Sequence, residues 1–140
     1  MAQVYRMDLL QNALASLCNS LAGVRAAVIV SIEGFVVAAY EPTRTVKNGR
    51  GEEDGTASSP QVAAMAATLI ALGERTLARL GQGDLNRLLI EGDFGAMLVV
   101  PASNRAAVAL MVPSNAKMGL SLYALKQASM EISAILEGEV

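Results

Sequence analysis

The sequence predicts an α/β (α+β) fold in which helices cover a five-stranded antiparallel sheet, in the order α-β-β-α-β-β-β-α. Short β-branched or apolar runs are joined by tight turns that contain glycine or polar residues, which is typical of hairpins and so of antiparallel pairing. Three longer segments have the apolar periodicity or the alanine content of helices. Residues 96–100 and 106–112 are apolar almost throughout, as expected of strands that are covered on both faces.

The composition indicates one domain, residues 1–140, with an aliphatic core. Hydrophobic residues make up 53% of the chain and aromatic residues only 4%, so the core must be built mainly from Ala, Val, Ile, Leu and Met. Eleven basic and thirteen acidic residues give a net charge of −2, which lacks the basic surface expected of a nucleic-acid binder. No nucleic-acid partner is therefore expected.

The absence of particular residues excludes whole classes of enzyme. Without histidine the chain cannot form a Ser-His-Asp or Cys-His catalytic site or a histidine-based zinc site. Its apolar runs are well short of the roughly 20 residues that cross a bilayer, and its first residues lack the basic-then-apolar order of a signal peptide. The single cysteine excludes an intrachain disulfide. We therefore expect a cytoplasmic, non-enzymatic protein without cofactor, metal or membrane insertion.

Residues 3–21 have the spacing of an amphipathic helix, and Gly23 just beyond them suits its C-terminal cap. The apolar positions are Met7, Leu10, Leu14, Leu17 and Leu21. Cys18 lies four residues after Leu14, on the same apolar side. Because cysteine commonly behaves as a small hydrophobic residue, we expect a buried core thiol rather than a reactive one.

Residues 25–40 predict a strand, a tight turn and a second strand. Gly34 supplies the positive φ that such a turn commonly needs. The polar and glycine-rich residues 41–59 that follow predict a loop. Its acidic residues are Glu52, Glu53 and Asp54. They could collect a divalent cation, but a solvated acidic loop is the favoured interpretation.

A second helix is predicted over residues 60–80. Pro60 opens it, Ser58 or Ser59 is a candidate N-cap, and Ser58 with Gln61 would form a capping box. The helix is rich in alanine and apolar around most of its first three turns, whereas a lone surface helix should show a polar face there. It is therefore either buried inside the domain or packed against a second copy, and the small size of the domain favours the second copy.

Three more strands are predicted, over residues 85–91, 96–101 and 106–112. The turn between the first two contains Asp93-Phe94-Gly95, the tripeptide that holds magnesium in protein kinases. A kinase also needs a histidine-containing catalytic loop, which this chain lacks, so we interpret the tripeptide as a hairpin turn. The polar start of the first of these strands, Leu85-Asn86-Arg87-Leu88, makes it the candidate for an exposed sheet edge.

A third helix is predicted near the C-terminus, with Ser114 as a candidate N-cap. The apolar positions that predict it are Met118, Leu122, Leu125, Ile132 and Leu136. No internal repeat of fixed period and no domain boundary interrupts the order of elements.

This order, together with several short motifs, resembles the Roadblock/dynein light chain family. The motifs are the Glu-Gly turn after the first helix, Gly73-Glu74-Arg75, Gly83-Asp84, the hairpin IEGDFGAMLVVP, the segment ALMVPSNAKMGL and the LKQAS of the last helix. The similarity covers roughly residues 5–136, nearly the whole chain. It implies a Roadblock/profilin-like fold.

The resemblance also implies how the protein acts. Members of this family pair as homodimers or heterodimers through the second helix and the third strand, which joins two five-stranded sheets into one of ten. They serve as platforms for small Ras-like GTPases or as adaptors on motor complexes. The similar MglB-type regulators of bacteria bind a polarity GTPase as a dimer and promote GTP hydrolysis without inserting an arginine finger.

The predicted dimer interface combines the second helix with the candidate edge strand. Its residues are Met65, Ala66, Leu69, Ile70, Leu72, Gly73, Leu85, Arg87 and Leu89. Arg87 is either an interface contact or a charge that guards the edge against aggregation. Glu74, Arg75 and Arg79 are candidates for contact with a partner, and their alternative role is a solvated or salt-bridged helix end that adds little stability.

We therefore expect a homodimeric interaction protein that binds and regulates a small Ras-like GTPase, with GTPase activation as one form of that regulation. Two alternatives stay open at this point. One is a structural adaptor without a GTPase partner. The other is a small-molecule sensory module, although a ligand pocket usually gathers polar and aromatic side chains, and this chain has only two phenylalanines and three tyrosines.

Overall fold

The computed structural model describes residues 2–42 and 60–138. The expected order of elements is confirmed. The helices are α1 (Ala2–Asn19), α2 (Pro60–Arg79) and α3 (Met118–Leu136), and the strands are β1 (Ala26–Ser31), β2 (Val36–Tyr40), β3 (Leu88–Gly92), β4 (Gly95–Pro101) and β5 (Ala106–Pro113).

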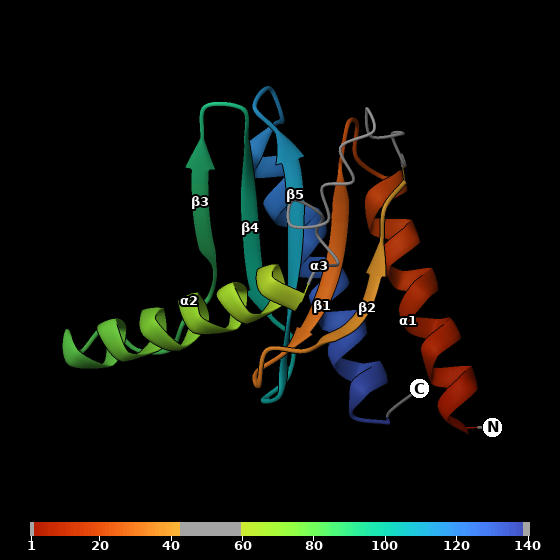
Figure 1. Ribbon diagram of the computed structural model, residues 1–140, viewed down its shortest axis with the longest axis horizontal. Coiled ribbons are helices and arrows are strands. Elements are labelled where there is room, and N and C mark those ends of the chain that lie inside the picture. Colours follow the sequence, from red (N-terminus) through yellow and green to blue (C-terminus); the bar gives the residue numbers. More distant parts are fainter. Residues whose placement is uncertain (1, 43–59, 139–140) are drawn as a thin grey trace.

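The five strands form one sheet in the order β2-β1-β5-β4-β3, and each neighbouring pair is antiparallel. β2 and β3 are therefore the two edges. Helices α1 and α3 lie on one face of the sheet, and α2 crosses the other face (Figure 1). The predicted antiparallel sheet covered by helices is confirmed, and so is the place of β3 at an edge.

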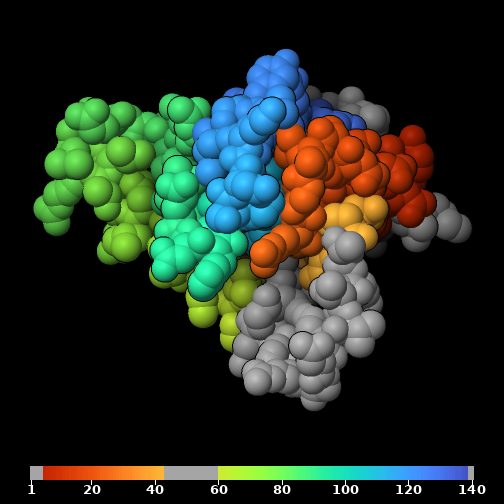
Figure 2. Space-filling view, turned by 90° about the horizontal axis from the view of Figure 1, so that it is seen from above, coloured from red at the N-terminus to blue at the C-terminus, as the bar shows by residue number. Residues whose placement is uncertain are grey.

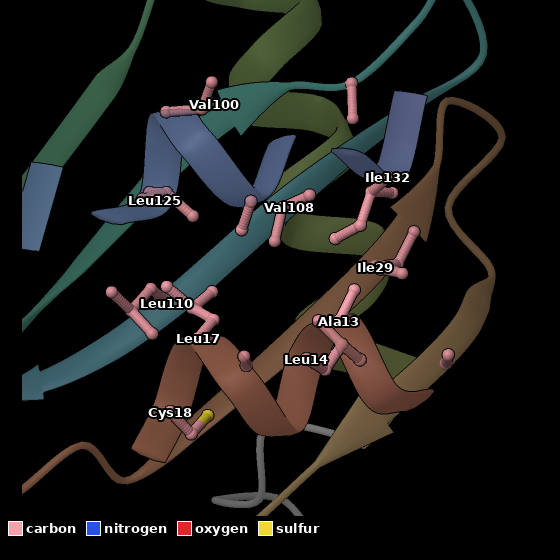
Figure 3. Packing of buried hydrophobic residues seen from close by; sticks show 14 of the residues in the cluster. Ala13, Leu14, Leu17, Cys18, Ile29, Val100, Val108, Leu110, Leu125 and Ile132 are labelled. Atoms are coloured by element: carbon pink, nitrogen blue, oxygen red, sulfur yellow. The ribbon is translucent and has the colours of Figure 1, made fainter. Parts of the chain in front are cut away.

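The larger core lies between the sheet and the pair α1 and α3. Alternate residues of the central strands point into it, among them Ile29 and Leu110, where they meet Leu14 of α1 and Ile132 of α3 (Figure 3). These four side chains are at most 1% exposed. Because the intervening strand residues face α2 instead, the central strands are apolar throughout, as their sequences predicted.

The smaller core lies under α2, which reaches the sheet through three buried residues, Ala63, Ala66 and Ile70. Two of them are alanines, so the helix backbone comes close to the strands. At the β1–β2 turn, Gly34 has a φ of +99°, and a Cβ there would lie 3.3 Å from the Cα of Ala64. Gly34 thus serves both the tight turn, as predicted, and the close packing of α2.

The third strand starts later than predicted. β3 begins at Leu88, where Leu88 pairs with Val99 of β4, and residues 85–87 form no strand. Leu85 instead packs against the smaller core, with its Cδ1 3.6 Å from the position of a Cβ at Gly73. Residues 85–87 therefore belong to the link between α2 and the edge strand β3.

Two helix caps also differ from the predictions. α1 ends at Asn19, and Gly23 takes its φ of +74° four residues later, in the turn beside Pro113. The N-cap of α3 is Lys117, not Ser114, and it makes no side-chain capping hydrogen bond. Ser114 lies in the turn after β5, where the Ala116 N–H donates to the Pro113 carbonyl at 3.1 Å. In both cases the predicted cap residue lies in a turn next to the helix, Gly23 after α1 and Ser114 before α3.

The start of the second helix is confirmed at Pro60. The predicted capping residues Ser58 and Ser59 lie outside the described residues, as do the acidic residues Glu52, Glu53 and Asp54 of the predicted loop.

Cys18 is buried in the larger core, as predicted (Figure 3). Its side chain is 3% exposed, and burial raises the pKa of the thiol from 9.0 to about 11. The thiolate is disfavoured in this environment because the apolar core cannot solvate its charge.

This pKa predicts an alkaline loss of stability that depends on Cys18. The folded pKa lies above the unfolded value, so the thiol's stabilising contribution is complete below about pH 9 and is lost as the pH rises through about 11. Between these values the wild type should lose about 2–3 kcal/mol more of its free energy of unfolding than Cys18→Ala. Urea denaturation of both proteins from pH 8 to pH 11 measures the difference. If the free energies of unfolding of the two proteins change in parallel with pH, the prediction is wrong.

Candidate functional site

A row of apolar side chains lies uncovered along α2. We call this row the α2 stripe, and it consists of Met65, Leu69 and Leu72 of α2 and of Leu80, the residue that follows the helix. Met65, Leu72 and Leu80 are 61%, 53% and 66% exposed, and Leu69 is half-buried. The spacing of Met65, Leu69 and Leu72 by four and three places these three on one side of the helix. Large contiguous apolar patches are uncommon on a protein surface that has no partner.

The edge strand β3 adjoins this stripe. It pairs only with β4, so one side of its backbone has no partner strand within the described part of the chain. Leu89 and Ile90 are 46% and 41% exposed and point to opposite faces of the sheet. Such an edge is a ready template for pairing with another chain.

The second half of α2 projects past this edge. In Figure 1 the helix crosses the sheet and continues beyond β3, and in Figure 2 its green C-terminal part stands out from the body of the molecule. All three buried residues of the helix lie in its first eleven positions, between Pro60 and Ile70. At the crossing, a Cβ at Gly73 would lie 3.5 Å from the Cδ1 of Leu88, which places this turn of α2 beside the start of β3.

The structure places the predicted interface residues in three different environments. Met65, Leu72, Arg87 and Leu89 are exposed, and Leu69, Gly73 and Leu85 are half-buried. Ala66 and Ile70 are 1% and 7% exposed and are buried against the chain's own sheet. Leu80 and Ile90, which sequence reasoning missed, extend the exposed apolar surface.

The candidate partner-contact residues Glu74, Arg75 and Arg79 are all exposed on the second half of α2. Their surface therefore lies on the part of the helix that projects beyond the sheet. Glu74 also lines a cleft. The other two side chains lie on a different side of the helix, roughly 100° or more away at 100° per residue.

This cleft has a volume of about 460 Å³ and lies between α2 and the turns at one end of the sheet. It is lined by Ile70 and Glu74 of α2, by Asp84 and Leu85 of the link to β3, and by Ser103 of the β4–β5 turn, among others. Of its lining residues, only Glu74 and Asp84 carry a charge. Sequence reasoning missed this cleft because its walls come from segments that are far apart along the chain.

The tripeptide that resembles a kinase motif is a hairpin turn, as predicted. Gly92 pairs with Gly95, and Asp93 and Phe94 form the two-residue turn between β3 and β4. In the described part of the chain, no three histidine, cysteine, aspartate or glutamate residues come together in a group that could hold a metal ion.

Among residues 2–42 and 60–138, no helix is long and apolar enough to cross a membrane.

Comparison with known proteins identifies the fold. An archaeal protein of uncharacterised function, MJ1340 of Methanocaldococcus jannaschii, is 29% identical over 117 residues, which are 84% of this chain and 91% of that protein. The gliding protein MglB of Thermus thermophilus superposes with a TM-score of 0.80 at 20% identity, covering 94% of this chain and 91% of its own. A second MglB structure, described as a tetrameric arrangement, gives a TM-score of 0.81 at 18% identity and covers 96% and 93% of the two chains.

The model of the Roadblock/LC7 domain family matches residues 10–111. This range runs from the middle of α1 to near the end of β5 and includes α2, β3 and all residues that line the cleft. The matched residues are well over half of the chain. The protein is therefore a member of the Roadblock/LC7 domain family.

Proposed function

We propose that residues 1–140 form a single Roadblock-like domain that assembles as a homodimer and, as a dimer, binds and regulates a small Ras-like GTPase. The protein acts by binding, without being an enzyme itself, in the cytoplasm. The observation that carries this proposal is the exposed α2 stripe beside the unpaired edge of β3.

The homodimer would satisfy both exposed features at once. Pairing of two β3 edges in antiparallel fashion joins the sheets and gives the free backbone groups partners. A two-fold axis then brings the α2 stripe of each copy toward that of the other, because the same patch on both subunits meets itself in such an interface. Met65, Leu72 and Leu80 would lose most of their exposed apolar surface.

The GTPase partner is supported by the family to which the chain belongs and by the charges on α2. Members of this family serve as platforms for small Ras-like GTPases or as adaptors on motor complexes. Here Glu74, Arg75 and Arg79 are exposed on the projecting half of α2, where a second protein can reach them without disturbing the sheet. The proposed regulation of the GTPase by the dimer includes faster GTP hydrolysis, which the GTPase's own catalytic residues carry out. The charged helix surface would position the partner.

A pulldown with small GTPases from the same genome tests this function. The immobilised chain should retain one such GTPase in a nucleotide-dependent manner when it is loaded with GDP or with a non-hydrolysable GTP analogue. Arg75→Ala combined with Arg79→Ala should weaken retention by about tenfold or more, because these two arginines are the proposed contacts with the GTPase. Lys126→Ala, an exposed cation on α3, is the matched control and should change nothing. Equal failure with both nucleotide states would refute the GTPase partner.

A further inference from the structure

The cleft beside α2 lies on the side of the helix that faces away from the α2 stripe. Ala67, Ile70 and Glu74 line it and are spaced by three and four residues. Glu74 follows Leu72 by two positions, which is a rotation of roughly 200° around the helix at 100° per residue. A dimer that buries the α2 stripe therefore leaves the cleft open, and binding in the cleft does not require the proposed dimer.

The charges around the cleft all favour a cation. Glu74 and Asp84 contribute two carboxylates, and no lysine or arginine is among the lining residues. Both carboxylates are exposed, and neither forms an ion pair within residues 2–42 and 60–138. Ala78, in the last turn of α2, also lines the cleft, so the cleft lies beside the C-terminal end of the helix, where the helix dipole carries partial negative charge.

The remaining lining is suited to an aliphatic chain. Ile70 and Leu85 form apolar walls beside the two carboxylates, together with Val30 and Ile32 from the end of β1 and the turn after it. Lysine and arginine side chains pack their methylene stems on such surfaces while the charged end meets a polar group. No aromatic side chain lines the cleft, so it lacks the cage that binds quaternary ammonium groups. Its volume of about 460 Å³ lies within the range of ligand pockets.

We propose that this cleft binds the side chain of a lysine or arginine that a partner protein presents. The methylene stem lies between Ile70 and Leu85, and the charged end is shared by Glu74 and Asp84. The hydrogen bonds to these carboxylates are charge-assisted and so stronger than those between neutral groups. The cleft would thus select partners by a basic residue, at a place separate from the α2 stripe.

Peptide titration monitored by NMR of the 140-residue chain tests this proposal. The probes are acetyl-Gly-Arg-Gly-amide and acetyl-Gly-Lys-Gly-amide, with acetyl-norleucyl-glycinamide as an uncharged control for the stem. The basic peptides should shift the backbone amide signals of Glu74, Ala78, Asp84, Leu85 and Ser103, with dissociation constants on the order of millimolar. The norleucine peptide should leave these signals in place. Added salt should weaken the binding.

Matched variants separate the cleft from general surface charge. Glu74→Gln and Asp84→Asn should each weaken the basic peptides by about three- to tenfold. Glu91→Gln removes an exposed carboxylate on β3 that does not line the cleft and should bind as the wild type does. All three positions are exposed, so unchanged melting temperatures are expected. The proposal is overturned if the basic peptides give no shifts at the cleft, if the norleucine peptide binds equally well, or if Glu74→Gln combined with Asp84→Asn binds with wild-type affinity.

Discussion

Leu72→Asp should convert the dimer into folded monomers. Leu72 is 53% exposed within one chain and lies in the middle of the α2 stripe. A carboxylate there is harmless to an isolated chain, because water still reaches it. In the dimer it would be buried against the partner's apolar stripe without a counter-charge. We expect a loss of at least about 2 kcal/mol of association free energy, which is a roughly 30-fold higher dissociation constant.

Light scattering at micromolar concentration measures this effect. The wild type should have a mass of about 29 kDa, twice the 14.6 kDa of one chain, and Leu72→Asp should approach 14.6 kDa. Leu120→Asp is the matched control, because Leu120 is 55% exposed on α3, on the opposite face of the sheet. It should stay dimeric. A wild-type mass of 14.6 kDa, or equal dissociation of both variants, would refute the interface.

The order of elements could be predicted because each turn is encoded by residues close together in the chain. Gly34 marks the β1–β2 turn, Pro60 marks the start of α2, and Asp93-Phe94 occupies the turn of the β3–β4 hairpin. The position of β3 at an edge also followed from its sequence, although the strand itself starts at Leu88. Local chemistry was sufficient for these features.

The two sides of α2 could not be told apart in the same way. The first three turns of the helix are apolar almost all round, so periodicity alone cannot say which residues face the sheet. In the structure Ala66 and Ile70 face the sheet, while Met65 and Leu72 face solvent. This distinction depends on how the helix crosses the strands, which is a property of the tertiary packing.

The cleft is a still clearer example of a site that local patterns do not reveal. Glu74 and Asp84 come within one cleft because the chain reverses after α2, where the Gln82 N–H donates to the Leu77 carbonyl at 2.8 Å and Gly81 adopts a φ of +67°. Ser103 reaches the same cleft from the β4–β5 turn. Neither carboxylate belongs to a motif, and only the fold brings them together.

Ile70→Asp should destabilise the fold of each chain, whereas Leu72→Asp, only two residues away, should destabilise the dimer. Ile70 is 7% exposed and is the largest of the three side chains that bury α2 against the sheet. An aspartate there would place a charge among Val28, Val99 and the other apolar residues of the smaller core, none of which can pair with it. Such a buried and unpaired charge costs several kcal/mol, which is a large part of the 5–15 kcal/mol that stabilises a typical domain.

We therefore expect Ile70→Asp to lose cooperative folding, whereas Leu72→Asp keeps it. Circular dichroism during heating measures the difference. The Leu72→Asp monomer should keep a sharp transition, and the Ile70→Asp chain should show a transition that is broad or shifted by 10 °C or more, since each kcal/mol lowers the melting temperature by roughly 2–8 °C in domains of this size range. If Ile70→Asp melts as the wild type does, the chain's own sheet is not what holds α2. Ile70 would then belong to the interface between copies, together with Leu72.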